Sequence, residues 1–187
     1  MGRLERALAI GGGVRGLPPV ERWNPPYCGD VGLAIAADGT WTYGGSPIRR
    51  EGLVKLFASV LRRDEDGRHY LVTPVEKVDV RVADAPFLAV DMDVIAGGDG
   101  ADTQVIVVAT NIGDVVRIGP EHPLRFDVEA SSGGLKPYVL VRGRLEARFT
   151  RSLAYDLALL AAQDGDGTTS IRSGGATFRL PLGDTRS

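Results

Sequence analysis

Residues 71–82 read LVTPVEKVDVRV and carry the clearest strand signal in the chain. Apolar and charged residues alternate along the second half of this stretch: Val78, Asp79, Val80, Arg81 and Val82. This period of two is typical of a half-buried strand. Pro74 precedes the alternation, and because proline lacks an N–H and fixes φ, it predicts a bulge or the beginning of the strand.

Polar groups of three kinds lie beside that proline, namely the hydroxyl of Thr73, the carboxylate of Glu76 and the ammonium of Lys77. Neighbours on a regular strand face opposite ways, so only one of Glu76 and Lys77 faces a cleft unless Pro74 induces a bulge. One interpretation is a small ligand-binding surface, and the other is a charge pair on the surface of a strand.

Composition limits what the chain can be. Its 187 residues suit one large domain or two small ones, and a net charge of −2 gives no general attraction for a nucleic acid polymer. A single cysteine, Cys28, excludes an intrachain disulfide and a cysteine-based metal site, and we expect it to be a small buried residue. No stretch approaches the roughly 18 apolar residues of a membrane span. We therefore expect a cytoplasmic protein without a membrane span.

Two segments have the spacing of an amphipathic helix, about residues 49–61 and residues 149–162. Their apolar positions are Leu53, Leu56, Phe57, Val60 and Leu61 in the first, and Leu153, Leu157 and Leu160 in the second. Arg49 and Arg50 would lie in the first turn of the first helix, where the helix dipole disfavours cations. This suggests a bound anion or a carboxylate partner, and the alternative is two solvated arginines.

The two helical segments lie in similar surroundings. TWTYGGSPIRREGLVKLFASVL (40–61) and YVLVRGRLEARFTRSLAYDLALL (138–160) each read as strand, glycine, basic stretch and helix, and an acidic glycine turn follows each. The echo predicts an α+β fold of two β-rich domains, each with one helix on an antiparallel sheet. The expected organisation is a flexible leader at 1–21, a first domain at 22–85 and a second domain at 86–187.

Three long stretches of the chain resemble a known family. WNPPYCGDVGLAIAADGTWTYGGSPIRREGLVKLFASVLRRDEDGRHYLVTPVEKVDVRVADAPF (23–87), TNIGDVVRIGPEHPLRF (110–126) and PYVLVRGRLEARFTRSLAYDLAL (137–159) are similar to the bacterial family called domain of unknown function 1285. The resemblance implies repeated strand–helix units in two domains, the second superficially similar to pleckstrin-homology folds. It also implies a nucleotide-like ligand in an interdomain cleft and a role in signal transduction, and no established catalytic activity.

The residues that best match the family's signatures are Pro47, Ile48, Arg49, Thr73, Pro74, Glu76, Lys77, Asn111, Gly113, Asp114, Pro123, Arg142 and Gly143. From these, the first hypothesis is a non-enzymatic protein that binds a small anionic ligand. Arg49, Lys77 and Arg142 would supply cations, while Thr73, Asn111 and Asp114 would bond to a base or sugar. Glu76 completes the expected site.

Two other hypotheses remain open. One is an enzyme acting on a phosphorylated or carboxylated metabolite, with Glu76 as the acid/base. The other is a protein-interaction module without a small-molecule ligand. The sequence contains no G-x-S-x-G, P-loop or H-E-x-x-H motif, and we expect the isolated His69 and His122 to be surface or packing residues. We expect no metal and no cofactor.

Overall fold

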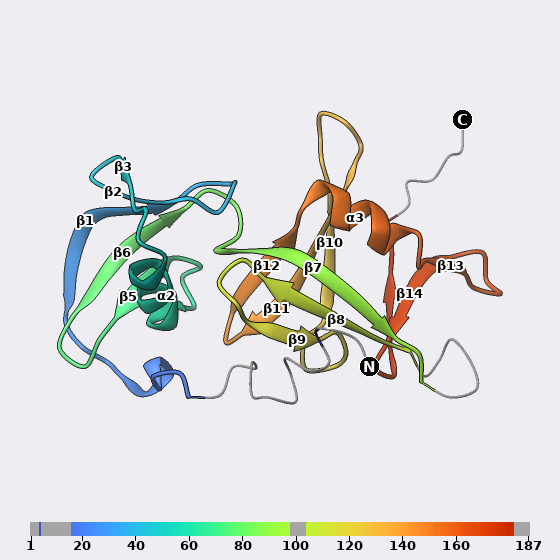
Figure 1. Ribbon diagram of the computed structural model, residues 1–187, viewed down its shortest axis with the longest axis horizontal. Coiled ribbons are helices and arrows are strands. Elements are labelled where there is room, and N and C mark those ends of the chain that lie inside the picture. The colour runs from blue at the N-terminus through green and yellow to red at the C-terminus, as the bar shows by residue number, and fades with distance from the viewer. Residues whose placement is uncertain (1–3, 5–15, 98–103, 182–187) are drawn as a thin grey trace.

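The computed structural model describes Leu4 and residues 16–97 and 104–181. Two β-rich domains lie side by side, each built on a six-stranded sheet (Figure 1). The first sheet ends at Val82 and the second begins at Phe87, so the chain passes from one domain to the other within a few residues. The structure thus has the mostly β, two-domain organisation that the sequence predicted.

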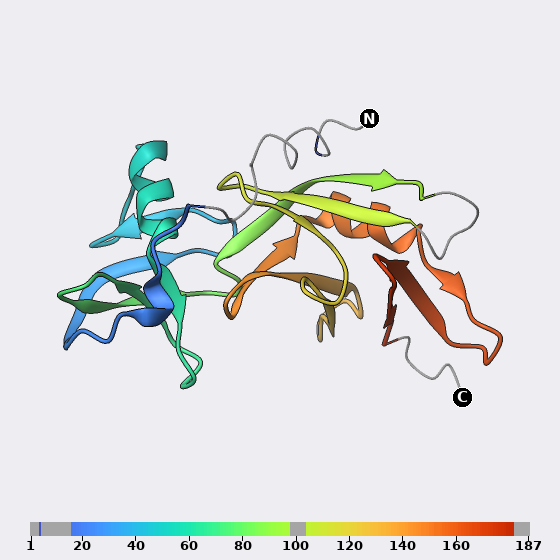
Figure 2. The same ribbon diagram turned by 90° about the horizontal axis from the view of Figure 1, so that it is seen from below.

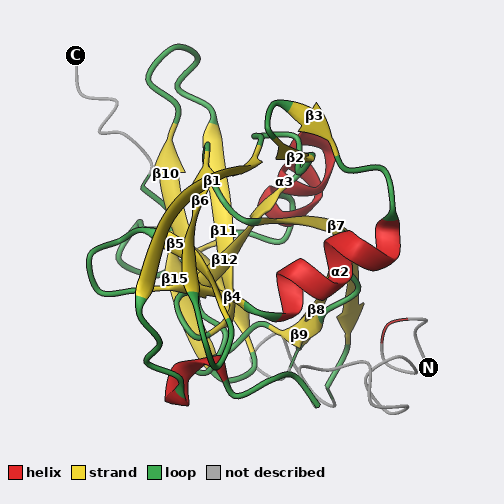
Figure 3. Ribbon diagram, turned by 90° about the vertical axis from the view of Figure 1, so that its left-hand side faces the viewer, coloured by secondary structure: helices red, strands yellow, loops and turns green. Residues whose placement is uncertain are grey.

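The first sheet has the strand order β3-β2-β1-β6-β5-β4. Its strands are β1 (Tyr27–Ile35), β2 (Trp41–Tyr43), β3 (Ser46–Pro47), β4 (Leu61–Arg63), β5 (His69–Val72) and β6 (Lys77–Val82). Helix α2 (Glu51–Ser59) lies along one side of this sheet (Figures 2 and 3), and a 3-10 turn, η1 (Val20–Arg22), precedes β1. The alternation in β6 is as predicted, since Val80 packs in the core while Asp79 and Arg81 point the other way.

The second sheet has the order β10-β11-β12-β7-β8-β9. Its strands are β7 (Phe87–Ile95), β8 (Val105–Thr110), β9 (Val115–Arg117), β10 (Leu124–Val128), β11 (Leu135–Arg142) and β12 (Leu145–Phe149). Helix α3 (Arg151–Ala158) then leads to a three-stranded sheet of β13 (Ala162–Gln163), β14 (Thr169–Ser173) and β15 (Ala176–Arg179). The connection between β7 and β8 includes residues 98–103, which lie outside the described residues.

The prediction of wholly antiparallel sheets is wrong at one pair in each. β1 runs parallel to β6, and β7 runs parallel to β12. Parallel neighbours need a long crossover. In the first domain the chain forms β2, β3, α2, β4 and β5 before β6 returns beside β1.

Both helices are shorter than predicted. Arg50 has an extended conformation and caps α2, which begins at Glu51, so Arg49 and Arg50 lie before the first turn. The chain is held extended there because Ile48 N donates to Trp41 O at 2.8 Å. Phe149 likewise belongs to β12 and not to α3. Strand pairing determines where these helices begin, and the spacing of apolar residues alone does not reveal those positions.

The sequence echo has a structural counterpart in the two acidic turns. In the first, Asp64 N donates to Arg68 O, Gly67 N to Asp64 O, and Arg68 N to the Asp66 carboxylate. The turn at 164–167 makes the same three bonds at positions one hundred residues later. In both halves a strand, a helix, a strand, this turn and two strands follow one another.

The small third sheet is fixed to the second through Ser173. Its hydroxyl accepts from Ile106 N and donates to Ile118 O, both at 2.8 Å. Gly174 follows with φ of +56°, and a Cβ there would lie 2.7 Å from Ile118 O. Only glycine tolerates both the left-handed conformation and so close a backbone.

Cys28 is exposed, contrary to the prediction of a buried residue, because it lies near the start of β1 where the strand is mostly uncovered. The helices in the described part of the chain are too short to cross the hydrocarbon core of a bilayer.

Candidate functional site

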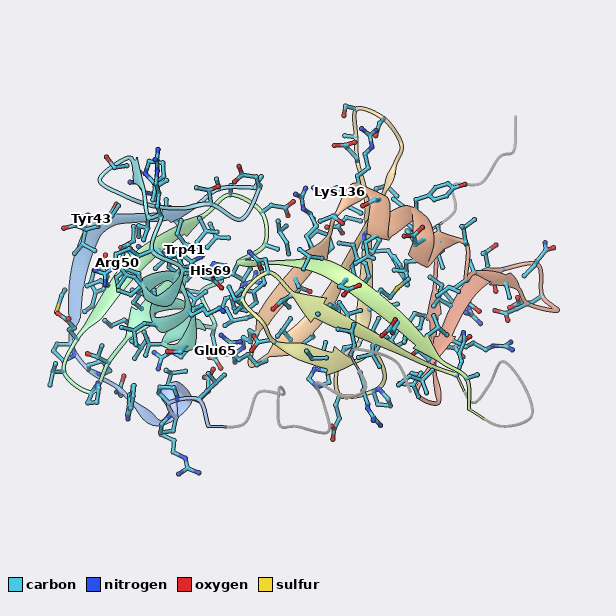
Figure 4. The ribbon with its side chains drawn as sticks, viewed as in Figure 1. Trp41, Tyr43, Arg50, Glu65, His69 and Lys136 are labelled. Carbon is cyan, nitrogen blue, oxygen red and sulfur yellow. The ribbon has the colours of Figure 1, made fainter. Side chains whose placement is uncertain are left out.

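A hollow of about 390 Å³ opens at the end of the first sheet. It is lined by Asp30, Gly67, Arg68, His69, Asp79, Val80, Arg81 and Val82. These residues come from β1, the acidic turn, β5 and the end of β6, which leads to the second domain. Figure 4 places His69 and Glu65 at the end of the first domain that faces the second.

Asp79 is the buried charge of this hollow, with 6% of its surface exposed. One carboxylate oxygen accepts from the Tyr27 hydroxyl, and the other accepts from Arg68 Nη2 at 2.5 Å. The Arg68 guanidinium also lies 5.4 Å from the centre of the Tyr70 ring and 6.0 Å from that of Tyr27. A buried carboxylate is stable only when paired and hydrogen-bonded, and both conditions are met here.

Asp30 reaches the hollow because β1 is irregular. Its pairing with β6 shifts register on both sides of Asp30, where Gly29 and Gly32 have positive φ. The Asp30 carboxylate accepts from Gly32 N at 2.7 Å and lies 3.7 Å from Arg81 Nε. This last ion pair is loose, and both side chains are about half exposed or more.

His69 lines the hollow as a neutral group. Burial lowers its pKa to about 4, and the nearby positive charge of Arg63 acts in the same direction. At neutral pH its ring can therefore donate or accept a hydrogen bond without adding charge.

Lys77 lies next to this region, in a second polar cluster on the same sheet. Its ammonium is 3.0 Å from the Asp64 carboxylate and 4.5 Å from the centre of the Tyr70 ring. Burial alone would raise the pKa of Asp64, but hydrogen bonds from Arg62 and Lys77 outweigh it and hold that pKa below its usual value. Arg62 also donates to the Val20 and Trp23 carbonyls at 2.8 Å. The cluster thus fastens the incoming chain to the sheet.

Thr73 and Glu76 form a turn before β6. Thr73 N donates to Glu76 O at 2.9 Å, and the Thr73 hydroxyl accepts from Glu76 N at 3.2 Å. Pro74 therefore lies in the connection between β5 and β6, so the prediction of a bulge or of the first residue of the strand is wrong. The Glu76 side chain is exposed there and does not line the hollow.

Asn111, Asp114 and Arg142 lie together where the two domains meet. Arg142 Nη1 pairs with the Asp114 carboxylate, Nη2 donates to Ala58 O at 2.6 Å, and the guanidinium lies 4.8 Å from the centre of the Phe87 ring. The Arg142 and Asp114 side chains are only 12% and 13% exposed. Because Ala58 belongs to α2, Arg142 joins the second domain to the C-terminal end of the first domain's helix.

The Asn111 side chain also takes part in the contact between the two domains. Its Oδ1 accepts from Leu88 N at 3.0 Å, and its amide nitrogen lies beside Gly39 of the first domain. Two further contacts join the domains. Arg144 lies 3.0 Å from the Glu65 carboxylate, and Arg148 donates to Ala37 O at 2.7 Å.

The seven residues expected to share one site therefore lie in three places. Thr73, Glu76 and Lys77 are near the start of β6, and Asn111, Asp114 and Arg142 are at the junction. Arg49 is exposed before α2, and no hydrogen bond or ion pair is found for it within the described ranges. The sequence did not identify Tyr27, Arg68, Asp79 and Arg81. The one usable signal was the pair of outward charges, Asp79 and Arg81, within the valine-rich strand.

Comparisons with known proteins cover nearly the whole chain. Residues 18–85 match the domain of unknown function (DUF1285), N-terminal domain, and residues 86–180 match the protein of unknown function (DUF1285), C-terminal domain. A crystal structure of a DUF1285 family protein from Silicibacter pomeroyi DSS-3 is 44% identical, with a TM-score of 0.81, over 94% of this chain and 93% of that chain. One from Shewanella baltica OS155 is 29% identical, with a TM-score of 0.51, over 67% of this chain and 88% of that one. No curated protein matches.

Proposed function

The chain belongs to the DUF1285 family, whose function is unknown, and we propose that it is a non-enzymatic protein that binds a small anionic, nucleotide-like ligand in the hollow beside Asp79. The proposal keeps the ligand class that the sequence suggested and moves the site from the domain junction to the end of the first sheet.

One observation carries the proposal: two exposed guanidinium groups line the same hollow. The Arg68 side chain is 56% exposed and the Arg81 side chain is 69% exposed. Arg68 donates to Asp79 through Nη2, and among the residues that the structure describes Arg81 has only the loose contact with Asp30. A planar guanidinium can donate two parallel hydrogen bonds to a phosphate or carboxylate, so this pair suits an anion.

Neighbouring groups favour an anion that carries a ring. Tyr27 is 52% exposed and lies beside Arg68, where its ring offers an aromatic face for stacking. Asp30 can accept from a hydroxyl or amine, and the neutral His69 can bond to either kind of group. An inorganic anion would use only the arginines.

The position of the hollow is consistent with signalling. Gly67 and Arg68 belong to the turn that carries Glu65, and Glu65 pairs with Arg144 of the second domain. A ligand that orders this turn would act on an interdomain contact. The residues first expected in the cleft are less suitable, because Arg142, Asp114 and Asn111 already satisfy one another or the backbone.

Calorimetric titration with adenosine monophosphate, adenosine and inorganic phosphate tests the proposal. We expect the nucleotide to bind more tightly than either fragment, and Arg81→Gln and Arg68→Gln each to weaken it about ten- to a hundredfold, as expected for a lost charge-assisted bond. Arg117→Gln, an exposed arginine in β9 of the second domain, is the matched control. Equal affinity in the two hollow variants and the control would refute the site, and turnover lost in Glu76→Gln would favour the enzyme instead.

A further inference from the structure

Leu4 lies buried against the second domain. Only 5% of its surface is exposed, and it forms a cluster with Val107 and Val115 that is separate from the main core. Its backbone N–H also donates to the Asp93 carboxylate at 3.1 Å. An apolar contact and a polar contact thus fix this residue, although it lies outside the stretch that matches the family.

The surface beneath Leu4 is the outer face of β7, β8 and β9. In β8 the side chains alternate, and Ile106 and Val108 point into the main core while Val107 points outward. An outward face of such a sheet is normally polar and solvated. Here it is apolar, and Val107 is nonetheless completely buried. The partly buried residues around it are Ile95, Val105 and Ala109.

The sequence around Leu4 suits such a face. The chain begins MGRLERALAI, in which Leu4, Ala7 and Leu8 have the spacing of one side of a helix, with charged residues between them. Further along, Arg62 of the first domain holds the chain by the Val20 and Trp23 carbonyls. The chain is therefore held on the second domain at Leu4 and on the first domain at Val20 and Trp23.

We propose that the outer face of β7, β8 and β9 is a docking surface for an amphipathic segment, and that its occupant is this chain's own N-terminal segment, anchored by Leu4. Leu4 covers apolar strand surface that would otherwise be exposed, and it holds the start of the chain on the second domain. Any other partner for this face has to displace Leu4. This inference does not depend on the proposed ligand.

Methyl NMR on the full chain tests the inference directly. We expect nuclear Overhauser effects from the Leu4 methyl groups to those of Val107 and Val115. In Leu4→Asp the Val107 and Val115 methyl resonances should shift, and the fluorescence of a hydrophobic dye should rise. Leu159→Asp is the matched control, because Leu159 is 66% exposed next to α3, and it should change none of these signals.

Absence of the Leu4–Val107 effect in the unmodified protein, or unchanged Val107 resonances in Leu4→Asp, would overturn the proposal. A sample that mixes two differently labelled chains tests whether Leu4 of the same chain or of a second copy occupies the face. Effects seen only between the two kinds of chain would mean that a second copy occupies the face, and that result would also overturn docking within one chain.

Discussion

Replacing Arg142 by methionine tests how strongly the two domains are joined. Methionine keeps most of the length of the side chain but removes its charge and its donors. The Asp114 carboxylate, 13% exposed, would lose its counter-charge, and Ala58 O would lose a donor at 2.6 Å. The Phe87 ring would lose the cation stacked on it. The variant therefore leaves a mostly buried charge unpaired.

The expected cost follows from that geometry. Removing one partner of a buried ion pair destabilises a protein by about 3–5 kcal/mol. Because Arg142 and Asp114 keep slight contact with solvent, we expect a loss near the lower end, about 3 kcal/mol. At roughly 2–4 °C per kcal/mol for a chain of this size, the melting temperature should fall by about 6–12 °C.

Urea unfolding followed by circular dichroism measures this loss, and Arg144→Met provides the control. Arg144 also bridges the domains, but its side chain is 51% exposed and its partner Glu65 is 88% exposed. An exposed pair contributes about 0–1 kcal/mol, so the control should unfold almost as the unmodified protein does. Adding Asp114→Leu to Arg142→Met should recover part of the loss, since no charge is then left unpaired.

If Arg142→Met costs no more than Arg144→Met, the Arg142–Asp114 pair does not hold the domains together and the reasoning from burial is refuted. A loss of about 3 kcal/mol that Asp114→Leu makes worse would refute the electrostatic part alone. In that case packing of the Arg142 stem, and not its charge, would be the source of stability.

Three further predictions concern single groups. His69 has a pKa of about 4 in the folded protein against 6.5 when solvated, so the unfolded chain binds a proton at a higher pH than the folded chain does. The contribution of His69 to stability should therefore be full above pH 6.5 and be lost as the pH falls towards 4. Urea titrations at several pH values measure this slope, and His69→Gln should reduce it. Tyr27→Phe removes a hydrogen bond to the buried Asp79 carboxylate and should cost about 1.5–3 kcal/mol in the same assay, whereas a loss below about 0.5 kcal/mol would mean that water replaces it. Gly174→Ala should destabilise the protein by more than Gly175→Ala, as compared by melting temperature, because both have positive φ but only at Gly174 would a Cβ meet a carbonyl oxygen, at 2.7 Å.

Local signals in the sequence were sufficient to identify most elements. The alternation through Val80 identified β6, and the spacing of Leu153 and Leu157 identified α3, because each pattern is set by neighbours within one element. The acidic glycine turns were also readable, since a side chain that bonds two residues along the chain is a local property.

Prediction of the candidate site failed for a physical reason. Tyr27 and Asp79 are 52 positions apart, and only the parallel pairing of β1 with β6 brings them together. Nothing near either residue in the sequence indicates that partner. Arg142 was recognised as a notable cation, but its use at the domain junction depends on Ala58, 84 positions away.

The order of residues thus determined the strands, the two helices, the repeated units and the division into two β-rich halves. These features depend on the side-chain period of each segment and on the backbone preferences of glycine and proline. Tertiary structure alone decided which strands became parallel neighbours, where the helices ended, which charges met in the hollow and at the junction, and which apolar side chains packed beneath Leu4. Those outcomes depend on contacts between distant segments, and such contacts exist only once the sheets have formed.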